Sequence, residues 1–293
     1  MYQELLEPTP TSLREASHKC RSWLFRQNLW FALLLRADAV ESGNALATAA
    51  AFESLVRKIF AVPSIAQREE HAHLLGQEID LGAEGRALSV MGRSLSEPFQ
   101  RYEIPPFLFR SRLPALQTEA SLATVGTREE LHALAKRLAH PTGRIALRIL
   151  GAASERNEVL ADALATGVQL ALWLRWLAED WRAGRLRLPM DELAHHRVDL
   201  ASLSSERTGD GVRSVVARSV ADAREALAKG WPLTDALGPL HGRRLAVFLR
   251  WHAASLSAIE FADYDALRHP PRGGLLRGLA CVAAGSATVR APF

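Results

Sequence analysis

Apolar residues recur at helical spacing through almost the whole chain, in long segments filled mainly by Ala, Leu, Arg and Glu. These side chains lose little conformational entropy when they enter a helix. Alternating runs of β-branched residues, which are typical of strands, are almost absent, and Tyr occurs only 3 times. The pattern predicts an all-α fold of roughly ten or more helices that are separated by short joints containing Pro and Gly.

The composition is that of a globular protein with a large core. Of the 293 residues, 48% are hydrophobic and 23% are charged. No Pro/Gly/Ser-rich linker and no shift in composition divides the sequence. We therefore expect a single domain over residues 1–293, with residues 1–10 as a tail.

The net charge and the cysteine content limit which partners and which cellular compartment we expect for this protein. The formal net charge is +4, and the chain has no zinc-finger spacing, RNA-binding aromatic motif or long Lys/Arg block, so no nucleic-acid partner is expected. Cys20 and Cys281 give no disulfide framework. No apolar run is long enough to span a bilayer. We expect a cytoplasmic protein that can contact a membrane peripherally, and the sequence leaves its oligomeric state open.

Capping residues and helix breakers mark the expected helix boundaries. Thr11 or Ser12 can cap a first helix that ends near Gln27, and Thr127 with Glu130 forms a capping-box pattern. The segments "SGN" (42–44) and "HPTGR" (140–144) are expected to end helices. The other helices are expected at about 28–41, 45–60, 64–77 with a further stretch to 95, 106–119, 155–181, 190–196, 212–228 and 238–261.

One stretch, "VQLALWLRWLAEDWRAGRLRLP" (168–189), combines an apolar helix with polar groups on one face. Positions i, i+4, i+7 and i+11 share a face, and here they are Gln169, Trp173, Trp176 and Asp180. Polar groups on a stripe fit for burial need partners or a cavity. Two interpretations stay open: the stripe lines a functional cavity, or Asp180 and Glu179 merely pair with Arg182 or Arg185 at a helix end.

The same stretch resembles the second signature of the squalene/phytoene synthase family, approximately ALQLxNxxxDVxxDxxxGRxYLP. The matching positions are Gln169, Leu170, Asp180, Gly184, Arg185, Leu188 and Pro189. Trp181 makes the stretch more similar to the hopanoid-pathway branch, the hydroxysqualene synthase-like members. Three further segments resemble the family in order and spacing: "RLAHPTGRIALRILG" (137–151), "GWPLTDALGPLHGRRLAVFLRWH" (230–252) and "EFADYDALRHPP" (260–271).

This resemblance implies an isoprenoid synthase-type helical bundle around a deep central cavity. It implies two facing helices whose aspartates hold Mg²⁺ ions, which bind the diphosphate of a prenyl substrate and help it leave. An apolar, aromatic-lined cavity would shield the carbocation from water. The implied substrate is a prenyl diphosphate such as farnesyl or presqualene diphosphate, in squalene or hopanoid-type isoprenoid metabolism.

Both aspartate-rich motifs of the family are altered in this chain. In "FALLLRADAVESG" (31–43), Asp38 matches the first Asp of the first motif, but Ala39 and Ser42 replace the other two. In the second motif Trp176 replaces the first Asp, and its indole would occupy the volume of an ion and its waters. Further family positions are changed at Leu134, Leu172 and Arg187.

The sequence therefore predicts a reduced site. Asp38 and Asp180 are the candidate catalytic residues, and the candidate metal ligands are Asp38, Glu41, Glu179 and Asp180. Because guanidinium groups and indoles bind phosphates and cations, respectively, the candidates for the diphosphate or the cavity wall are Arg36, Arg144, Arg185, Gln169, Trp173 and Trp176. Trp173 and Trp176 could face a cation or plug a redundant cavity, and for Trp176 the plug is favoured.

Two functions of different class stay open at this point. The chain is either an enzyme of this family that acts on a prenyl diphosphate with Mg²⁺, or a catalytically silent relative. In the second case its helical shell would bind an isoprenoid, a partner protein or a membrane assembly. The missing carboxylates shift the balance slightly towards loss of the standard metal-dependent chemistry.

Overall fold

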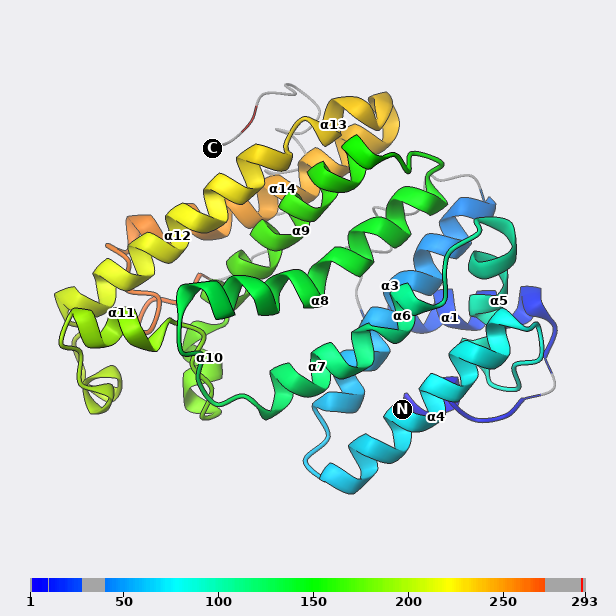
Figure 1. Ribbon diagram of the computed structural model, residues 1–293, viewed down its shortest axis with the longest axis horizontal. Coiled ribbons are helices and arrows are strands. Elements are labelled where there is room, and N and C mark those ends of the chain that lie inside the picture. Colours follow the sequence, from blue (N-terminus) through cyan, green and yellow to red (C-terminus); the bar gives the residue numbers. More distant parts are fainter. Residues whose placement is uncertain (1, 10, 28–39, 272–290, 292–293) are drawn as a thin grey trace. The chain divides into compact units, whose positions relative to one another are not determined.

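The computed structural model describes residues 2–9, 11–27, 40–271 and 291 (Figure 1). The α-helices are α1 (Leu13–Gln27), α3 (Val40–Phe60), α4 (Ile65–Ala83), α5 (Val90–Arg101), α6 (Phe107–Arg110), α7 (Arg112–Ser121), α8 (Arg128–Ile149), α9 (Glu155–Arg175), α10 (Leu177–Arg182), α11 (Met190–His195), α12 (Asp210–Gly230), α13 (Leu233–Ala236) and α14 (Gly238–Phe261). Two 3-10 helices are η1 (Gln3–Leu5) and η2 (Leu200–Ser204). The described residues form no strand and only two isolated β-bridges. None of their helices is long and apolar enough to cross a membrane. The all-α prediction is confirmed.

By its internal contacts the chain divides into two compact units. Unit 1 contains Met1–Ser121 and Pro141–Ser154, and unit 2 contains Leu122–His140 and Glu155–Phe293. Helix α8 supplies residues to both units. That the two units act as a single domain stays a prediction.

Unit 1 has its core around α5, against which α1, α3 and α4 all pack. The rings of Phe52 and Phe99 each meet the ring of Phe109 edge-on, with centroids 5.0 and 5.5 Å apart. Edge-on contacts of this kind align the positive edge of one ring with the negative face of the next. Trp23 of α1 is also in this core, with only 1% of its surface exposed. Aromatic packing therefore holds the N-terminal helices together.

A buried ion pair crosses the same unit. Arg112 at the start of α7 is 1% exposed, and its Nε donates to Oε1 of Glu53 in α3 at 2.7 Å. The hydroxyl of Thr142 donates to the same oxygen, also at 2.7 Å. A charge that is removed from water needs both a counter-charge and hydrogen bonds, and Glu53 has both.

In unit 2, α12 lies along α9 (Figure 1). Two glycines allow this close approach. A Cβ on Gly167 of α9 would lie 2.8 Å from the backbone nitrogen of Leu227, and one on Gly230 of α12 would lie 2.6 Å from the carbonyl oxygen of Leu160. Both distances are too short for any side chain, so the pairing of α9 with α12 depends on these two positions being glycine.

We expect Gly242→Ala to destabilise the protein by about 1–3 kcal/mol, because overpacking forces the backbone apart. A Cβ at this position would lie 1.8 Å from the carbonyl oxygen of Thr234, where α13 meets α14. Gly76→Ala is the matched control, since its Cβ would lie at an ordinary 3.6 Å from Leu113 and would gain about 0.5–1 kcal/mol from lower chain entropy. Urea denaturation of the two variants checks this, and equal midpoints would contradict it.

Two predicted helix starts are confirmed by their hydrogen bonds. The backbone nitrogen of Glu15 donates to the hydroxyl of Ser12 at 3.2 Å, which caps α1. Glu130 N donates to the Thr127 hydroxyl at 3.2 Å, and Thr127 N donates to the Glu130 carboxylate at 3.3 Å. This reciprocal pair is the capping box that the sequence predicts.

Two predicted helix ends are wrong, and one helix break was not predicted. The segment 42–44 lies inside α3, where Asn44 accepts a hydrogen bond from Arg21 at 3.1 Å. The segment 140–144 lies inside α8 despite Pro141. There the ring of His140 is 3.2 Å from Asp162 and 3.0 Å from the Thr166 hydroxyl, both on α9. The predicted helix over 155–181 is interrupted at position 176. In the first two cases tertiary contacts outweigh a local breaking signal.

Candidate functional site

The predicted stripe on α9 and α10 is buried at one end and open at the other. Gln169 and Trp173 are 3% and 5% exposed, whereas Trp176 is 49% exposed. Trp176 is the one residue between the two helices, and its backbone angles (φ −101°, ψ 13°) break the helical register. The prediction that Trp176 fills a cavity as ordinary core is therefore wrong, because about half of its side chain is exposed.

Asp180 is engaged by Arg185 of the turn that follows α10. Arg185 Nη2 and Nε donate to Oδ1 of Asp180 at 2.6 and 3.2 Å. The backbone closes the same turn, since Arg185 N donates to Asp180 O at 2.8 Å and Gly184 N to Trp181 O at 2.9 Å. Gly184 has φ +76°, a conformation that favours glycine. This hydrogen-bond pattern is a Schellman helix ending, so three residues that match the family signature here end a helix.

The segment after this turn is anchored by its backbone. Leu186 N donates to Ala123 O at 2.7 Å, and Met190 N donates to Val125 O at 3.0 Å. Arg187 is 3% exposed and donates to Leu122 O at 3.0 Å. The arginine that replaces the family tyrosine thus satisfies a carbonyl of the neighbouring chain segment.

The described residues fit a magnesium cluster poorly. Glu179 is exposed on the surface of α10, and Oδ1 of Asp180 is taken by Arg185. Among the residues that the structure describes, no three His, Cys, Asp or Glu side chains gather as a metal site. Mg²⁺ requires octahedral oxygen coordination. Of the two predicted ligands on α10, Asp180 keeps one carboxylate oxygen that has no partner within the described residues, and the carboxylate of Glu179 is exposed.

The other predicted site residues lie elsewhere. Arg36 and Asp38 fall outside the described residues, as does the side chain of Glu41, whose backbone lies in the first turn of α3. Arg144 is on the part of α8 that belongs to unit 1, and its side chain is half-buried. The pairing of Asp38 with Asp180 across a cavity stays a prediction.

A cluster on α9 and α14 that the sequence reasoning did not predict surrounds Arg175. The guanidinium carbon of Arg175 lies 5.6 Å from the ring centroid of Trp176 and 5.2 Å from that of Trp251. The adjacent His252 is 4% exposed and meets the ring of Phe248 at 4.7 Å. Cation–π contacts hold the charge of Arg175 in place. The "FLRWH" of α14, with aromatic residues three positions apart, was the available signal.

Burial decides the charge state of His252. Burial first, and then the nearby positive charge of Arg175, lowers the pKa of His252 from 6.5 to about 4. Its Nδ1 is buried and has no hydrogen-bond partner among the described residues. The imidazole is therefore neutral at physiological pH, and Arg175 carries the positive charge of this cluster.

The fold and the signature turn together define an all-helical protein of the isoprenoid synthase type. A model of the family "Squalene/phytoene synthase" matches residues 32–277. The chain belongs to this family, and the resemblance seen in the sequence is confirmed.

Two curated relatives show how the similarity is distributed. Phytoene synthase of Thermus thermophilus is 29% identical over 185 residues, which are 62% of this chain and 63% of the relative. Phytoene synthase 1, chloroplastic, of Zea mays is 30% identical over 151 residues, 48% of this chain and 36% of the relative. This chain thus covers less than two thirds of the length of either relative.

Solved structures extend the likeness in fold. Squalene synthase HpnC from Alicyclobacillus acidocaldarius superimposes with a TM-score of 0.80 at 23% identity, covering 87% of this chain and 97% of that chain. A dehydrosqualene synthase in complex with ligand gives a TM-score of 0.84 at 16% identity, covering 94% and 96%. At these identities the likeness shows a shared fold, and the chemistry depends on the residues of the site.

Proposed function

We propose that this chain binds a prenyl diphosphate, such as farnesyl or presqualene diphosphate, in squalene or hopanoid-type isoprenoid metabolism without the family's magnesium-dependent ionisation of that substrate. One observation supports the absence of magnesium-dependent ionisation. Asp180 is tied to Arg185 in a helix-ending turn, and Trp176 stands where the resemblance implies the partner carboxylate. Mg²⁺ that binds a diphosphate usually takes one or two protein carboxylates in addition to the phosphates. On this helix one of the two carboxylate positions is Trp176, and the other carboxylate is paired with Arg185.

A positive charge and an aromatic surface support the binding of a prenyl diphosphate. Arg175 is fixed between the indoles of Trp176 and Trp251, next to the position of the missing carboxylate. A guanidinium forms charge-assisted hydrogen bonds to phosphate oxygens and carries its charge at every physiological pH. Trp176, half exposed, offers an apolar face that suits an isoprenoid chain. The diphosphate would thus meet a fixed guanidinium in place of a metal ion.

The test is incubation of the purified protein with farnesyl and presqualene diphosphates, with Mg²⁺ or with EDTA. We expect no diphosphate release above buffer in either case. Calorimetry with a non-hydrolysable farnesyl diphosphate analogue should show binding that does not depend on Mg²⁺. Arg175→Gln should weaken that binding by about tenfold or more, because it removes charge-assisted hydrogen bonds.

The matched control for this variant is Arg218→Gln. Arg218 is on α12 of the same unit, is 66% exposed and makes only a loose ion pair with Asp222 at 3.7 Å. Its loss should leave binding unchanged. Absence of binding by the wild-type protein would refute the proposal, and so would equal losses in the two variants.

One specific observation favours the magnesium-dependent alternative, an active prenyltransferase or diphosphate lyase. Oδ2 of Asp180 has no partner among the described residues, and Mg²⁺ can be held by one or two carboxylates together with substrate phosphates. Diphosphate release that requires Mg²⁺ and disappears in Asp180→Ala would establish this alternative and refute the metal-free proposal.

A further inference from the structure

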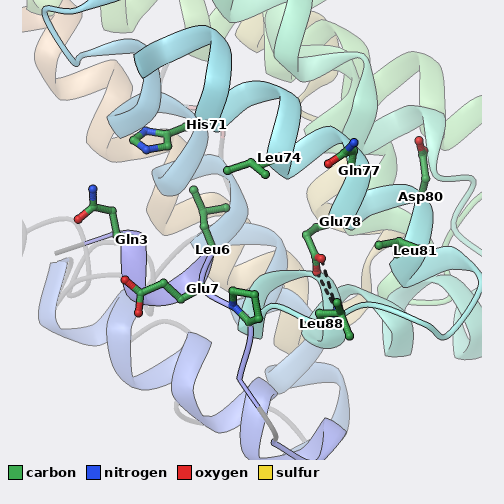
Figure 2. Close-up of a pocket in the computed structure, with 11 residues that line it drawn as sticks. Gln3, Leu6, Glu7, His71, Leu74, Gln77, Glu78, Asp80, Leu81 and Leu88 are labelled. Carbon is green, nitrogen blue, oxygen red and sulfur yellow. Dashed lines mark hydrogen bonds between the residues drawn. The ribbon is translucent and has the colours of Figure 1, made fainter. Parts of the chain in front are cut away.

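A groove on unit 1 lies apart from the site described above. It has a volume of about 810 Å³ and lies between the N-terminal segment 3–8, helix α4 and Leu88. Figure 2 shows Leu6 and Leu74 near one end of this groove, and Glu78, Leu81 and Leu88 near the other. We name it the α4 groove. The volume is of the size that proteins use to hold a ligand or an anchoring side chain.

The apolar part of the α4 groove is open to water. Leu74 is 41% exposed and Leu88 is 52% exposed, and Leu6 and Leu81 line the same groove. Single exposed leucines are normal on protein surfaces. Four leucines that line one groove can instead accept apolar side chains of a partner together.

Hydrogen bonds hold one wall of the groove in shape. The carboxylate of Glu78 accepts from the backbone nitrogens of Leu88 and Ser89 at 3.1 and 2.8 Å, and from the Ser89 hydroxyl at 2.6 Å. At the other end the Tyr2 hydroxyl is 2.9 Å from Nδ1 of His71. The groove therefore exists before any partner arrives, which lowers the entropy cost of binding.

The charged groups that line the groove are acidic. They are Glu7, Glu78 and Asp80, and no Lys or Arg is among the lining residues. Asp80 is paired with Arg110, but the charges of Glu7 and Glu78 meet no cation among the described residues. Helix α4 as a whole carries four acidic residues and one arginine, in a chain whose net charge is +4. The groove is thus a negative region on a basic protein.

The leucines and the carboxylates of the α4 groove together indicate which class of molecule it can bind. A prenyl diphosphate or an anionic membrane surface would be repelled by the carboxylates. We propose that the α4 groove binds a basic amphipathic helix of a partner protein, with leucine-type side chains on the groove floor and Lys or Arg side chains against Glu7 and Glu78. Helix-in-groove binding uses this pattern of apolar anchors and complementary charge. This interaction goes beyond the proposed function and does not depend on it.

The probe is a labelled helical peptide of about 15 residues, with Leu at positions i, i+3, i+4 and i+7 and Lys elsewhere. Fluorescence anisotropy with the full-length protein should show saturable binding that weakens as salt rises from about 0.05 to 0.5 M. A peptide with Glu in place of Lys should not bind. Absence of binding by the Lys peptide, or equal binding of both peptides, would overturn the proposal.

Variants locate the binding on the groove. The double variant Leu74→Asn/Leu88→Asn should weaken binding by about tenfold or more, and Glu7→Gln by about threefold with a smaller salt dependence. All three side chains are exposed, so these proteins should fold, which circular dichroism checks. The matched control is Leu240→Asn on α14 of unit 2, where the leucine is 51% exposed.

Two further results would refute the assignment. Equal affinity in the double variant and in Leu240→Asn would show that the peptide binds elsewhere. Co-sedimentation with phosphatidylglycerol vesicles that is lost in the double variant would mean that the same surface contacts a membrane. The proposal expects the double variant and the wild-type protein to behave alike with such vesicles.

Discussion

Replacing Arg112 by Met is expected to destabilise the protein by about 3–5 kcal/mol, because the change leaves the Glu53 charge buried without its partner. Arg112 is 1% exposed and Glu53 is 16% exposed. Burial alone would raise the pKa of Glu53. The charge and hydrogen bonds of Arg112, with smaller contributions from the charge of Arg57 and the Thr142 hydroxyl, outweigh burial and hold that pKa below its ordinary value. The variant should lose this stabilisation, and its Glu53 should take up a proton at a higher pH.

A neighbouring arginine supplies the control for this prediction. Arg110 is two residues away and pairs with Asp80, but the two side chains are 55% and 50% exposed. Arg110→Met should therefore change the free energy of unfolding by less than about 1 kcal/mol. The double variant Glu53→Leu/Arg112→Met should recover most of the loss, since an apolar pair often replaces a buried ion pair at little cost. Equal stabilities of Arg110→Met and Arg112→Met in urea denaturation would contradict the prediction.

Acidification from pH 7 to pH 4 is expected to remove about 3 kcal/mol of stability through His252 alone. The pKa of His252 is about 4 in the folded protein and 6.5 when unperturbed. Between these values the unfolded chain binds a proton that the folded protein does not, so stability falls as pH falls. The effect is absent above pH 7, begins near pH 6.5 and reaches its full size as the pH falls through 4.

His252→Phe isolates this effect from the other titrating groups. At pH 8 the imidazole is neutral in both the folded and the unfolded state, so the difference between variant and wild type measures packing alone. That difference should shift in favour of the variant by about 3 kcal/mol on acidification to pH 4. An NMR titration of the His252 ring should place its midpoint near pH 4. Parallel stability curves for the two proteins would show that His252 does not titrate in this way.

In the signature turn, residues that match the family motif also have a structural role. Asp180, Gly184 and Arg185 match the family pattern, and here they form the ending of α10. The positive φ of Gly184 and the ion pair are sufficient reasons for these residue types. A match to a catalytic signature therefore establishes the fold more firmly than it establishes the reaction.

Local signals in the sequence were sufficient where the chemistry itself is local. Ser12 caps α1, and Thr127 with Glu130 closes a capping box, because each contact spans only three residues. Pro141 gave the opposite signal, yet α8 continues through it. The contacts that hold His140 come from α9, which lies further along the chain. A prediction from neighbouring residues in the sequence cannot include these contacts.

The sequence by itself determined the helical class, the family and the alteration of the carboxylate motifs, because helical periodicity and motif spacing are properties of neighbouring residues. The pairing of Asp180 with Arg185 was one of two alternatives that the sequence offered, and the structure selects it. Only the tertiary structure decided that Trp176 is half exposed and that Arg175 contacts an indole from α14. These features depend on a one-residue helix break and on contacts between distant segments. The burial of a side chain and its electrostatic environment depend on such contacts. Neither can be read from the pattern of neighbouring residues in the sequence.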